Sequence, residues 1–510
     1  MSTAIAENPL RAGIRVERTP QPCVVVIFGA SGDLTKRKLI PALYDLARDH
    51  LLPAGFSVVG FSRTDMSHDQ FRAQMRDAVE QFGSRRSVDP QAWEEFAQGL
   101  WYISAHPAHP EEYPKLAQLL AQVDQQRGTA GNRVYYLAVP PSSIGDIVRH
   151  LNSAGLAQPA QGWTRIVVEK PFGRDLASAQ MLNRELGKAF REEQIYRIDH
   201  YLGKETVQNL LVFRFANGIF EPVWNRRYVQ QVQITAAESI GVENRASYYE
   251  EAGTLRDMVQ NHLLQVLALT AMEPPVNFEA DAVQTEKIKA LRSIRPIAEN
   301  EVEQFVVRGQ YGPGWSDGQQ AIGYRSEPGV NPNSRTETYV ALKLFLDNWR
   351  WAGIPFYLRA GKRLPKRVTG IAIQFRQPPL RLFERSSPDA IEPNLLAMRI
   401  QPDEGIALKF QAKLPGPAMH VRSVNMDFRY ATSFGAHTAD AYSRLLLDCM
   451  LGDSTLFATD KTVEVAWSLV DPIENAWQKD TTPAFPNYAA GTWGPSQADK
   501  LMEEGKWREL

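Results

Sequence analysis

The chain has 510 residues, of which 44% are hydrophobic and 23% charged, so its composition is that of a globular protein rather than a disordered one. Its 57 Lys and Arg residues are balanced by 58 Asp and Glu residues, which excludes a global positive field for nucleic acid or for an anionic membrane surface. Two cysteines exclude a disulfide framework and a cysteine-rich zinc site, so we expect no metal and a cytoplasmic location.

The length exceeds that at which one hydrophobic core keeps growing, and we expect two domains. Residues 1–22 carry charges throughout and no apolar core of signal-peptide length, which predicts a flexible N-terminal tail. A nucleotide-binding domain is predicted over residues 23–198 and a larger domain over residues 199–510. No window reaches ~18 consecutive apolar residues, so no membrane-spanning helix is expected.

The first predicted element is a strand over residues 23–28, whose continuous apolar run suits a parallel sheet buried on both faces. It leads into a turn of the form G-x-x-G and then into helical spacing, although Pro41 should kink or delay the helix. Glycines let backbone N–H groups approach a pyrophosphate, and the helix N-terminus favours its charge. Many strand-to-helix turns use two glycines for structure alone, and that alternative stays open. The candidate cofactor-binding residues of the turn are Gly29, Ala30, Ser31, Gly32, Asp33 and Leu34.

A second predicted strand, residues 57–61, ends at Arg63 rather than at an acidic residue. An Asp or Glu at this position of a dinucleotide-binding fold binds the ribose 2′-hydroxyl of NAD, whereas an Arg suits the 2′-phosphate of NADP. We therefore predict a preference for NADP. Asp65 lies two residues further on, which leaves use of both cofactors open, and Arg63 could also be an ordinary surface residue.

Two further apolar runs, residues 134–139 and 165–169, alternate with helical segments. This alternation predicts an α/β domain with a Rossmann-like, doubly wound parallel sheet. Ligands of such sheets gather at the carboxyl ends of the strands, which is where Lys170 falls. A lysine at a strand end is more often simply solvated.

Beyond residue 200 the regular alternation is lost, and an α+β domain with a mostly antiparallel open sheet and helices is predicted. Helices are expected at residues 254–272 and near residues 440–451. The strand-like runs of this part are residues 229–236, 304–308, 339–345, 370–375 and 406–412.

His262 lies on the apolar face of the helix expected at residues 254–272. A histidine on such a face is more often a hydrogen-bonded core residue than a catalyst. If His262 is a general base, it needs a carboxylate from another segment, because Asp257 is five residues earlier and off that face of an α-helix. Asp199 is a candidate.

Two short runs are unusually polar. Residues 197–205 combine four charged groups, an imidazole and a phenol around one glycine, and residues 359–367 carry five cations. Each run is either a solvated loop or a polar site, and the second could hold a phosphate or sugar oxygens.

Together these segments resemble the glucose-6-phosphate dehydrogenase family, from about residue 24 to residue 446. The resemblance implies oxidation of D-glucose 6-phosphate at C1 by NADP, which gives the 6-phospholactone and NADPH in the first step of the oxidative pentose phosphate pathway. The residues that carry it, in the order and spacing of the family, are 29–34, 169–173, 197–205, 256–265 and 359–362.

Carried over by position, His262 looks like the general base and Asp199 like its carboxylate partner. Lys170 would sit between cofactor and substrate, and Pro171 resembles the family's cis-proline hinge. The spacing favours Arg367 over Lys366 as the second basic substrate contact. The other residues implied to bind substrate are His200, Tyr201 and Lys204 for the phosphate and Glu238, Asp257 and Lys362 for sugar hydroxyls. The residues implied to contact the dinucleotide include Gly29, Gly32, Lys38 and Arg63.

Two other functions compete with this interpretation. A glucose-fructose oxidoreductase type of enzyme also joins a Rossmann domain to an open sheet, but it lacks the 197–205 run. A catalytically silent NADP-binding sensor or scaffold is disfavoured because Asp199, His262 and Lys204 are all present. We expect a small-molecule substrate, no nucleic-acid or membrane partner, and a homodimer or homotetramer, which is the habit of the family.

Overall fold

The computed structural model describes residues 19–84, 87–316, 318–380, 382–383, 391–434, 440–480 and 482–508. Of the tail predicted over residues 1–22, residues 1–18 therefore lie outside the described residues. The chain divides into two compact units. The first comprises the described residues up to Lys170 with Leu182–Ile198 and Asp440–Phe457, and the remainder forms the second.

These units do not coincide with the predicted domains in two segments. Pro171–Met181 belongs to the second unit and Asp440–Phe457 to the first. In the first unit, Arg165 Nη1 donates to the carbonyl oxygens of Cys449 and Met450, at 2.8 and 2.7 Å, and so binds the end of the late helix α13 (Ala441–Leu451). The boundary predicted at residues 198 and 199 remains a prediction.

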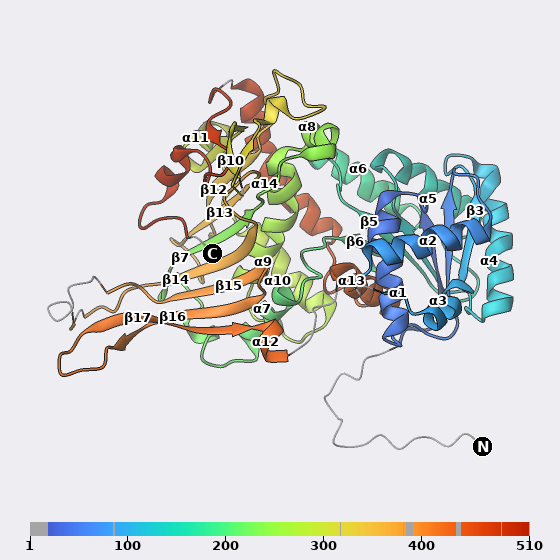
Figure 1. Cartoon of the computed structure of the whole chain (residues 1–510), viewed down its shortest axis with the longest axis horizontal. Coiled ribbons are helices and arrows are strands. Elements are labelled where there is room, and N and C mark those ends of the chain that lie inside the picture. The colour runs from blue at the N-terminus through green and yellow to red at the C-terminus, as the bar shows by residue number, and fades with distance from the viewer. Residues whose placement is uncertain are drawn as a thin grey trace, which may run out of the picture. The chain divides into compact units, whose positions relative to one another are not determined.

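The first unit is built on a parallel sheet, part of which is labelled in Figure 1. Its described strands run in the order β3-β2-β1-β4-β5-β6. Every residue of the central strand β1 is buried, as its continuous apolar run predicts. The order reverses between β1 and β4, which is the point where such sheets bind ligands. The strands are β1 (Cys23–Phe28), β2 (Phe56–Ser62), β3 (Leu100–Ser104), β4 (Arg133–Leu137), β5 (Thr164–Glu169) and β6 (Ile195–Ile198).

Helices connect these strands, as right-handed crossovers of a parallel sheet require. Their bounds are α1 (Ile40–Arg48), α2 (His68–Phe82), α3 (Pro90–Ala97), α4 (Tyr113–Arg127), α5 (Ile144–Ser153) and α6 (Leu176–Gly187). Before α1 the chain forms a π-helix, η2 (Thr35–Leu39), and Pro41 stands in the first turn of α1. The helical backbone runs on from η2 into α1, since the Ile40 N–H donates to the Thr35 carbonyl oxygen, so Pro41 stands where the winding changes from π- to α-helical.

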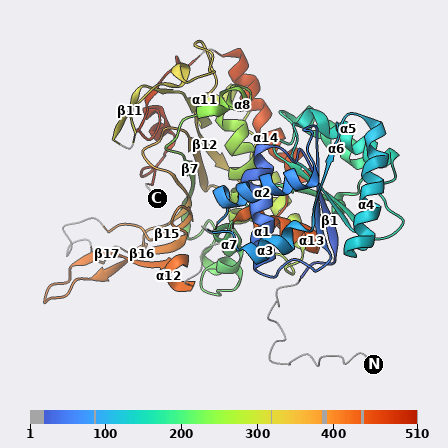
Figure 2. The ribbon, with the colours of Figure 1, turned by 45° about the vertical axis from the view of Figure 1, so that its right-hand side comes forward.

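The second unit is built on a mixed sheet in the order β17-β16-β15-β14-β7-β13-β12-β8. Its neighbouring strands are antiparallel except for β7 and β13, which are parallel. Figures 1 and 2 both show β16 and β17 side by side as a long hairpin. The strands are β7 (Val229–Ala237), β8 (Val306–Gly309), β12 (Tyr339–Phe345), β13 (Pro355–Gly361), β14 (Val368–Phe375), β15 (Leu395–Gln401), β16 (Gly405–Lys413) and β17 (Val421–Arg429).

Helices of the second unit pack against this sheet and against one another. The π-helix η8 contacts β7 and β13, and α9, which continues it, contacts α7 and α10. The helix predicted over residues 254–272 is thus two segments of different winding. The bounds are α7 (Glu205–Phe215), α8 (Ala246–Thr254), η8 (Leu255–Leu263), α9 (Leu264–Ala271), α10 (Ala280–Arg292), α11 (Val302–Phe305), α12 (Tyr430–Phe434) and α14 (Asp460–Lys479).

The predicted fold class is confirmed: a doubly wound parallel sheet is followed by a larger α+β part with a mostly antiparallel sheet. Within the described residues, no helix combines the length and the apolar character needed to cross a membrane. Both cysteines are buried and unbridged.

Candidate active site

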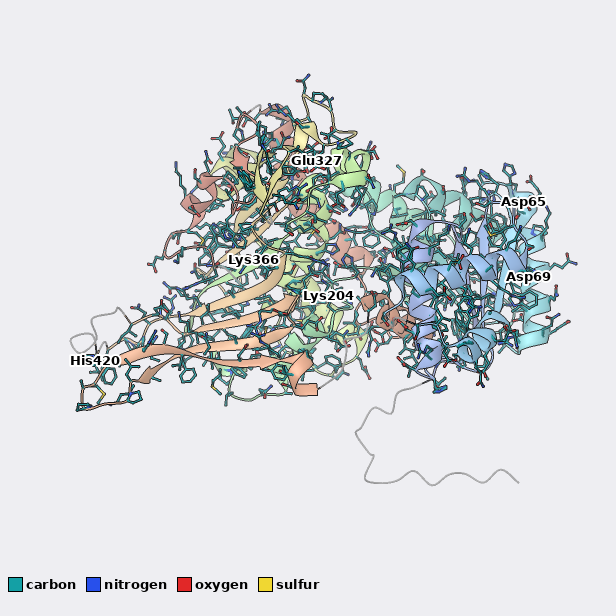
Figure 3. All side chains as sticks on the ribbon, viewed as in Figure 1. Asp65, Asp69, Lys204, Glu327, Lys366 and His420 are labelled. Carbon is teal, nitrogen blue, oxygen red and sulfur yellow. The ribbon has the colours of Figure 1, made fainter. Side chains whose placement is uncertain are left out.

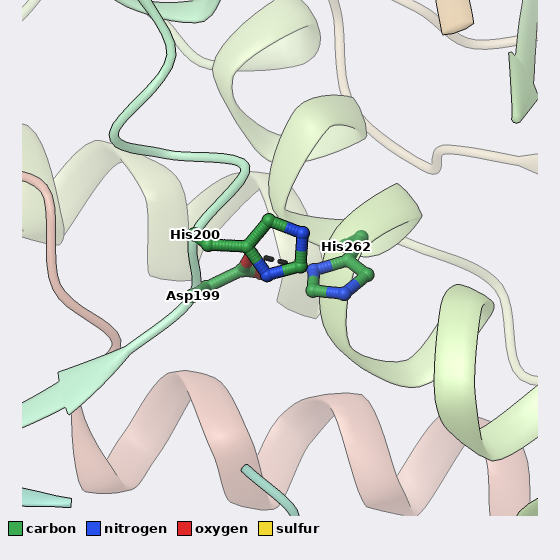
Figure 4. A group of neighbouring side chains, drawn as sticks. All are labelled: Asp199, His200 and His262. Atoms are coloured by element: carbon green, nitrogen blue, oxygen red, sulfur yellow. Dashed lines mark hydrogen bonds and ion pairs between the residues drawn. The ribbon is translucent and has the colours of Figure 1, made fainter. Parts of the chain in front are cut away.

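The centre of the candidate site is a buried pair formed by Asp199 and His262 (Figure 4). Asp199 comes directly after β6, and His262 lies near the end of η8. The two side chains are 2% and 1% exposed, and Asp199 Oδ1 lies 2.5 Å from His262 Nδ1. A carboxylate at Nδ1 fixes the tautomer of the ring, so Nε2 is the nitrogen that accepts a proton in such a pair.

The surroundings of Asp199 keep it ionised. Burial raises the pKa of its carboxyl, but the charge and hydrogen bond of His262 outweigh burial, helped by His200 and the Tyr201 amide. The pKa of Asp199 is therefore lowered below its ordinary value. That amide donates to Asp199 Oδ1 over 2.9 Å. The carboxylate is thus an oriented anion that can stabilise a positive imidazolium.

Aromatic contacts hold the His262 ring on its other sides. The Tyr201 ring stacks on it with centroids 4.3 Å apart and an angle of 18°. His200 lies next to the same ring in Figure 4 and meets it edge-on, with ring centroids 4.6 Å apart. The Tyr201 hydroxyl is buried 3.5 Å from Thr369 Oγ1. Tyr201, implied above to bind phosphate, therefore also positions the imidazole by packing.

The same three side chains could in principle be metal ligands. Asp199, His200 and His262 each offer one ligand atom, and these atoms lie within 4.8 Å of one another. The Asp199–His262 hydrogen bond already engages Nδ1, however, and the stacked Tyr201 ring restricts rotation of the imidazole. We interpret the group as a general base with its partner.

Lys204, labelled in Figure 3, lies beside this pair. Its ammonium is 4.3 Å from the centroid of the Tyr201 ring and donates to Gln401 Oε1. Gln401 Nε2 in turn donates to Thr369 Oγ1 over 2.9 Å, and these two residues are paired across β15 and β14. Lys204 is thus held as a cation next to the base, where it could attract an anionic group.

A second polar pair forms where two parallel strands end. Glu238 follows β7 and Lys362 follows β13, and because these strands are parallel, both residues emerge at the same edge of the sheet. Lys362 Nζ donates to Glu238 Oε2 over 2.6 Å. The Lys362 side chain is buried, and its ammonium lies 5.1 Å from the centre of the Tyr249 ring. Such a pair offers both a donor and an acceptor to sugar hydroxyls.

Asp257 lies in the same π-helix as His262 and accepts a hydrogen bond of 2.8 Å from the Tyr248 hydroxyl. The expectation that Asp257 is far from the face of His262 assumed α-helical winding. In a π-helix the repeat is i to i+5, so residues five apart come closer to one face. Because this segment is wound as a π-helix, Asp257 lies closer to the face of His262 than the sequence spacing predicted.

The predicted choice between Lys366 and Arg367 is not resolved by contacts. Both side chains are exposed, and Lys366, labelled in Figure 3, lies 5.9 Å from the centre of the Trp493 ring. Arg367 directly precedes β14. Its role as the second basic substrate contact stays a prediction.

The glycine turn of the first unit has the geometry of a tight strand-to-helix connection. Gly29 has φ +85°, and a Cβ atom there would lie 2.2 Å from the Ala138 carbonyl oxygen. The Gly32 amide donates to the Gly29 carbonyl oxygen over 2.9 Å, Ser31 Oγ lies 2.7 Å from Ser62 Oγ, and Ala30 is fully buried. Asp33 and Leu34 open the helix that follows. Packing against Ala138 therefore requires glycine at position 29, and the N-terminus of the helix that follows the turn is where a pyrophosphate could bind.

The basic candidates of the first unit lie around this turn. Arg63 is exposed directly after β2. Lys38 Nζ forms an ion pair of 2.7 Å with Asp440, so a contact with cofactor requires it to leave or share that partner. Lys170 follows Glu169, whose half-buried carboxylate accepts a hydrogen bond of 2.5 Å from Tyr136.

The cis-proline expectation for Pro171 is wrong for this structure. Among the described residues, the cis X-Pro bonds precede Pro402, Pro483 and Pro486, and the bond before Pro171 is not one of them.

Sequence reasoning missed three partners in the site: Tyr248, Thr369 and Gln401. Thr369 and Gln401 lie on neighbouring strands whose pairing only the fold fixes. Tyr248 lies nine residues before Asp257, across a break at Gly253, whose backbone is not helical. No local pattern joins these residues to the ones they hold.

Comparisons with known proteins agree over nearly the whole chain. The family model described as the NAD binding domain of glucose-6-phosphate dehydrogenase matches residues 26–209, and that of its C-terminal domain matches residues 211–508. Glucose-6-phosphate 1-dehydrogenase of Chlamydia muridarum is 50% identical over 495 residues, covering 96% of this chain and 97% of the relative. The enzyme of Bacillus subtilis is 45% identical over 479 residues, covering 94% and 96%. A solved structure of glucose-6-phosphate dehydrogenase with its substrate glucose-6-phosphate has a TM-score of 0.87 and 34% identity, covering 97% of this chain and 99% of that one.

Proposed function

Because the chain belongs to the glucose-6-phosphate dehydrogenase family, we propose that it oxidises D-glucose 6-phosphate at C1 with NADP. The products are 6-phospho-D-glucono-1,5-lactone and NADPH. This reaction is the first step of the oxidative pentose phosphate pathway. The observation that carries this function is the buried Asp199–His262 pair, with Nδ1 and Oδ1 2.5 Å apart.

In this reaction His262 is the general base. Its Nε2 takes the proton of the C1 hydroxyl, while Asp199 holds the ring by Nδ1 and stabilises the imidazolium that forms. When bound, the nicotinamide of NADP supplies the hydride acceptor. The protein thus contributes one proton acceptor and the positions of the reacting groups.

We assign the substrate contacts in two groups. His200, Tyr201 and Lys204 bind the phosphate, supported by the cationic Lys204 held beside Tyr201. The sugar hydroxyls are bound by the second group, which comprises Glu238, Asp257, Lys362 and Arg367. Lys170, at the end of β5, contacts both substrate and cofactor.

NADP is bound by the glycine turn and by the basic residues around it. The positive φ of Gly29 and the helix that opens at Asp33 support a pyrophosphate at the turn. Arg63, exposed after β2, meets the 2′-phosphate, and Lys38 exchanges its Asp440 ion pair for a phosphate oxygen. The remaining members, Ala30, Ser31, Gly32, Asp33 and Leu34, line the turn.

The active form is a cytoplasmic homodimer or homotetramer. This proposal is supported by the outer strand of the large sheet, β17, which exposes Val424 and Met426 at 38% and 62%. Apolar side chains on an unpaired edge strand favour association with another copy of the chain.

The test is an initial-rate assay of the purified protein with glucose 6-phosphate, comparing NADP with NAD. We expect NADPH formation at 340 nm that depends on the sugar phosphate and is more efficient with NADP. A protein that binds NADP but produces no NADPH would be the catalytically silent binder instead.

A further inference from the structure

Lys287 is a buried lysine for which the proposed mechanism has no role. It lies in α10, its side chain is 0% exposed, and its Nζ atom has no hydrogen-bond partner among the described residues. Removing an ammonium group from water without a partner is costly, and such a group is usually matched by an opposite charge or loses its proton.

Packing alone does not explain a lysine at this position. The buried residues of α10 recur at helical spacing, and Lys287 stands in the middle of that stripe between Val283 and Leu291. The helix packs against α9 and α14. Since α9 continues η8, which carries His262, Lys287 projects from a helix that packs on the direct continuation of the segment bearing the proposed base.

A negative charge that is likewise buried, and that has one oxygen without a hydrogen bond, lies at the centre of the site. Asp199 Oδ1 takes both hydrogen bonds, from His262 and from the Tyr201 amide, whereas Oδ2 is buried without a hydrogen-bond partner in the described part of the chain. Burial lowers the pKa of Lys287 to about 8, and the nearby Asp199 carboxylate opposes that effect. On the side of Asp199, the charges that lower the pKa of its carboxyl are those of His262 and His200.

We propose that Lys287 is a positioning residue for the oxidation of glucose 6-phosphate: its buried ammonium is a positive charge beside Asp199 and holds the Asp199–His262 pair in its reactive arrangement. The proposal rests on the proposed function of this site. Lys287 touches neither substrate nor cofactor in this role, and it acts through Asp199.

The physical consequence concerns the charge on His262. Asp199 favours the imidazolium, and a second cation nearby opposes it. Lys287 therefore limits how strongly His262 holds a proton. The ring is then neutral when it must take the proton of the C1 hydroxyl, and it releases that proton after turnover. Without Lys287 the ring should remain protonated up to a higher pH.

The experiment compares Lys287→Met, which removes the charge at similar side-chain shape, with Lys287→Arg, which keeps it. The matched control is Lys289→Met, which removes a charge from the same helix where the lysine is 65% exposed and paired with Glu286. The pH dependence of kcat/KM for glucose 6-phosphate is measured for each variant and the unaltered protein.

We expect the acid limb of the Lys287→Met profile to move to higher pH by at least about one unit, the size expected from one charge about 12 Å away at an effective dielectric constant of about 20. KM at the optimum should stay close to that of the unaltered protein. Lys287→Arg and Lys289→Met should keep the original acid limb. An unshifted acid limb in Lys287→Met, with or without a lower rate, overturns the proposal and leaves Lys287 a packing residue.

A second measurement does not depend on turnover. NMR titration of selectively labelled histidines, with the His262 signal assigned from His262→Asn, should show the same upward shift in Lys287→Met. No NADP reduction by the unaltered protein would refute the proposed function, whereas the histidine titration would still decide whether Lys287 acts on His262.

Discussion

A single hydrogen bond determines what His262 can do. The carboxylate of Asp199 is bonded to Nδ1 at 2.5 Å, and the stacked Tyr201 ring prevents the imidazole from turning away. An asparagine in place of His262 can fill much of the space but cannot accept a proton at neutral pH. The rate of the chemical step should therefore fall more than the affinity for the sugar.

We expect His262→Asn to lower kcat by ~10²-fold or more while glucose 6-phosphate binds with nearly normal affinity. Steady-state kinetics and calorimetric titration measure the two quantities separately. His420→Asn is the control, because His420 is exposed beyond β16 and should keep full turnover (Figure 3). Full turnover in His262→Asn would remove this histidine from the mechanism.

Arg63 is the residue on which cofactor choice should depend. It is exposed at the end of β2, where a guanidinium can pair with the 2′-phosphate that distinguishes NADP from NAD. We expect Arg63→Ala to weaken NADP by about tenfold or more and NAD little, as measured from KM for each cofactor. Arg76→Ala, on the exposed surface of α2, should change neither value. Equal losses for both cofactors would mean that Arg63 does not meet this phosphate.

Among the elements, the glycine turn after β1 is the one whose shape allows no side chain. A Cβ at Gly29 would overlap the Ala138 carbonyl oxygen, and φ is +85°. We expect Gly29→Ala to lower the thermal midpoint and to abolish tight NADP binding, at a cost of at least ~1 kcal/mol from the backbone alone. Gly145→Ala is the matched control, since open space surrounds Gly145 within α5 and alanine should be neutral or stabilising there.

Lys287, in the middle of α10, should make the free energy of unfolding depend on pH. Its pKa is about 8 when folded and 10.5 ordinarily, so between these values the unfolded chain binds more protons and stability rises with pH. Below about pH 8 the full cost of burying the charge remains. We expect Lys287→Met to be more stable than the unaltered protein at pH 7, by ~3 kcal/mol. Its stability should no longer rise with pH between about pH 8 and pH 10.5. Scanning calorimetry at pH 7 and pH 10 measures both, and an unchanged difference between the two pH values would contradict the shift.

How far the elements could be predicted depends on whether their cause is local. The strand over residues 23–28 and its glycine turn follow from apolar runs and backbone freedom, and the structure has both. The π-helical winding of Leu255–Leu263 has no such local signature, and it changes which residues share a face with His262. The Lys362–Glu238 pair depends on β7 and β13 being parallel across more than a hundred residues of chain. A lone lysine in the buried stripe of α10 was a visible signal, but its meaning requires knowing that α10 packs against α9.

At the scale of the whole molecule, association should depend on the outer strand of the large sheet. Its partner strand β16 covers only one edge of β17, and the other edge remains unpaired among the described residues. Val424 and Met426 are two residues apart, so they lie on one face of β17 and form an exposed apolar pair. A second copy of the chain could cover that face, whereas a lysine placed there would have to lose water on association.

We therefore expect Met426→Lys to weaken self-association by about tenfold or more, shifting the sedimentation velocity distribution toward the monomer at low micromolar concentration. Val276→Lys is the control, because Val276 is 93% exposed in the connection between α9 and α10 and should leave the distribution unchanged. Since the Asp199–His262 pair is contained within one chain, kcat per chain should fall less than association does. An unchanged distribution for Met426→Lys would place the contact between copies on another surface.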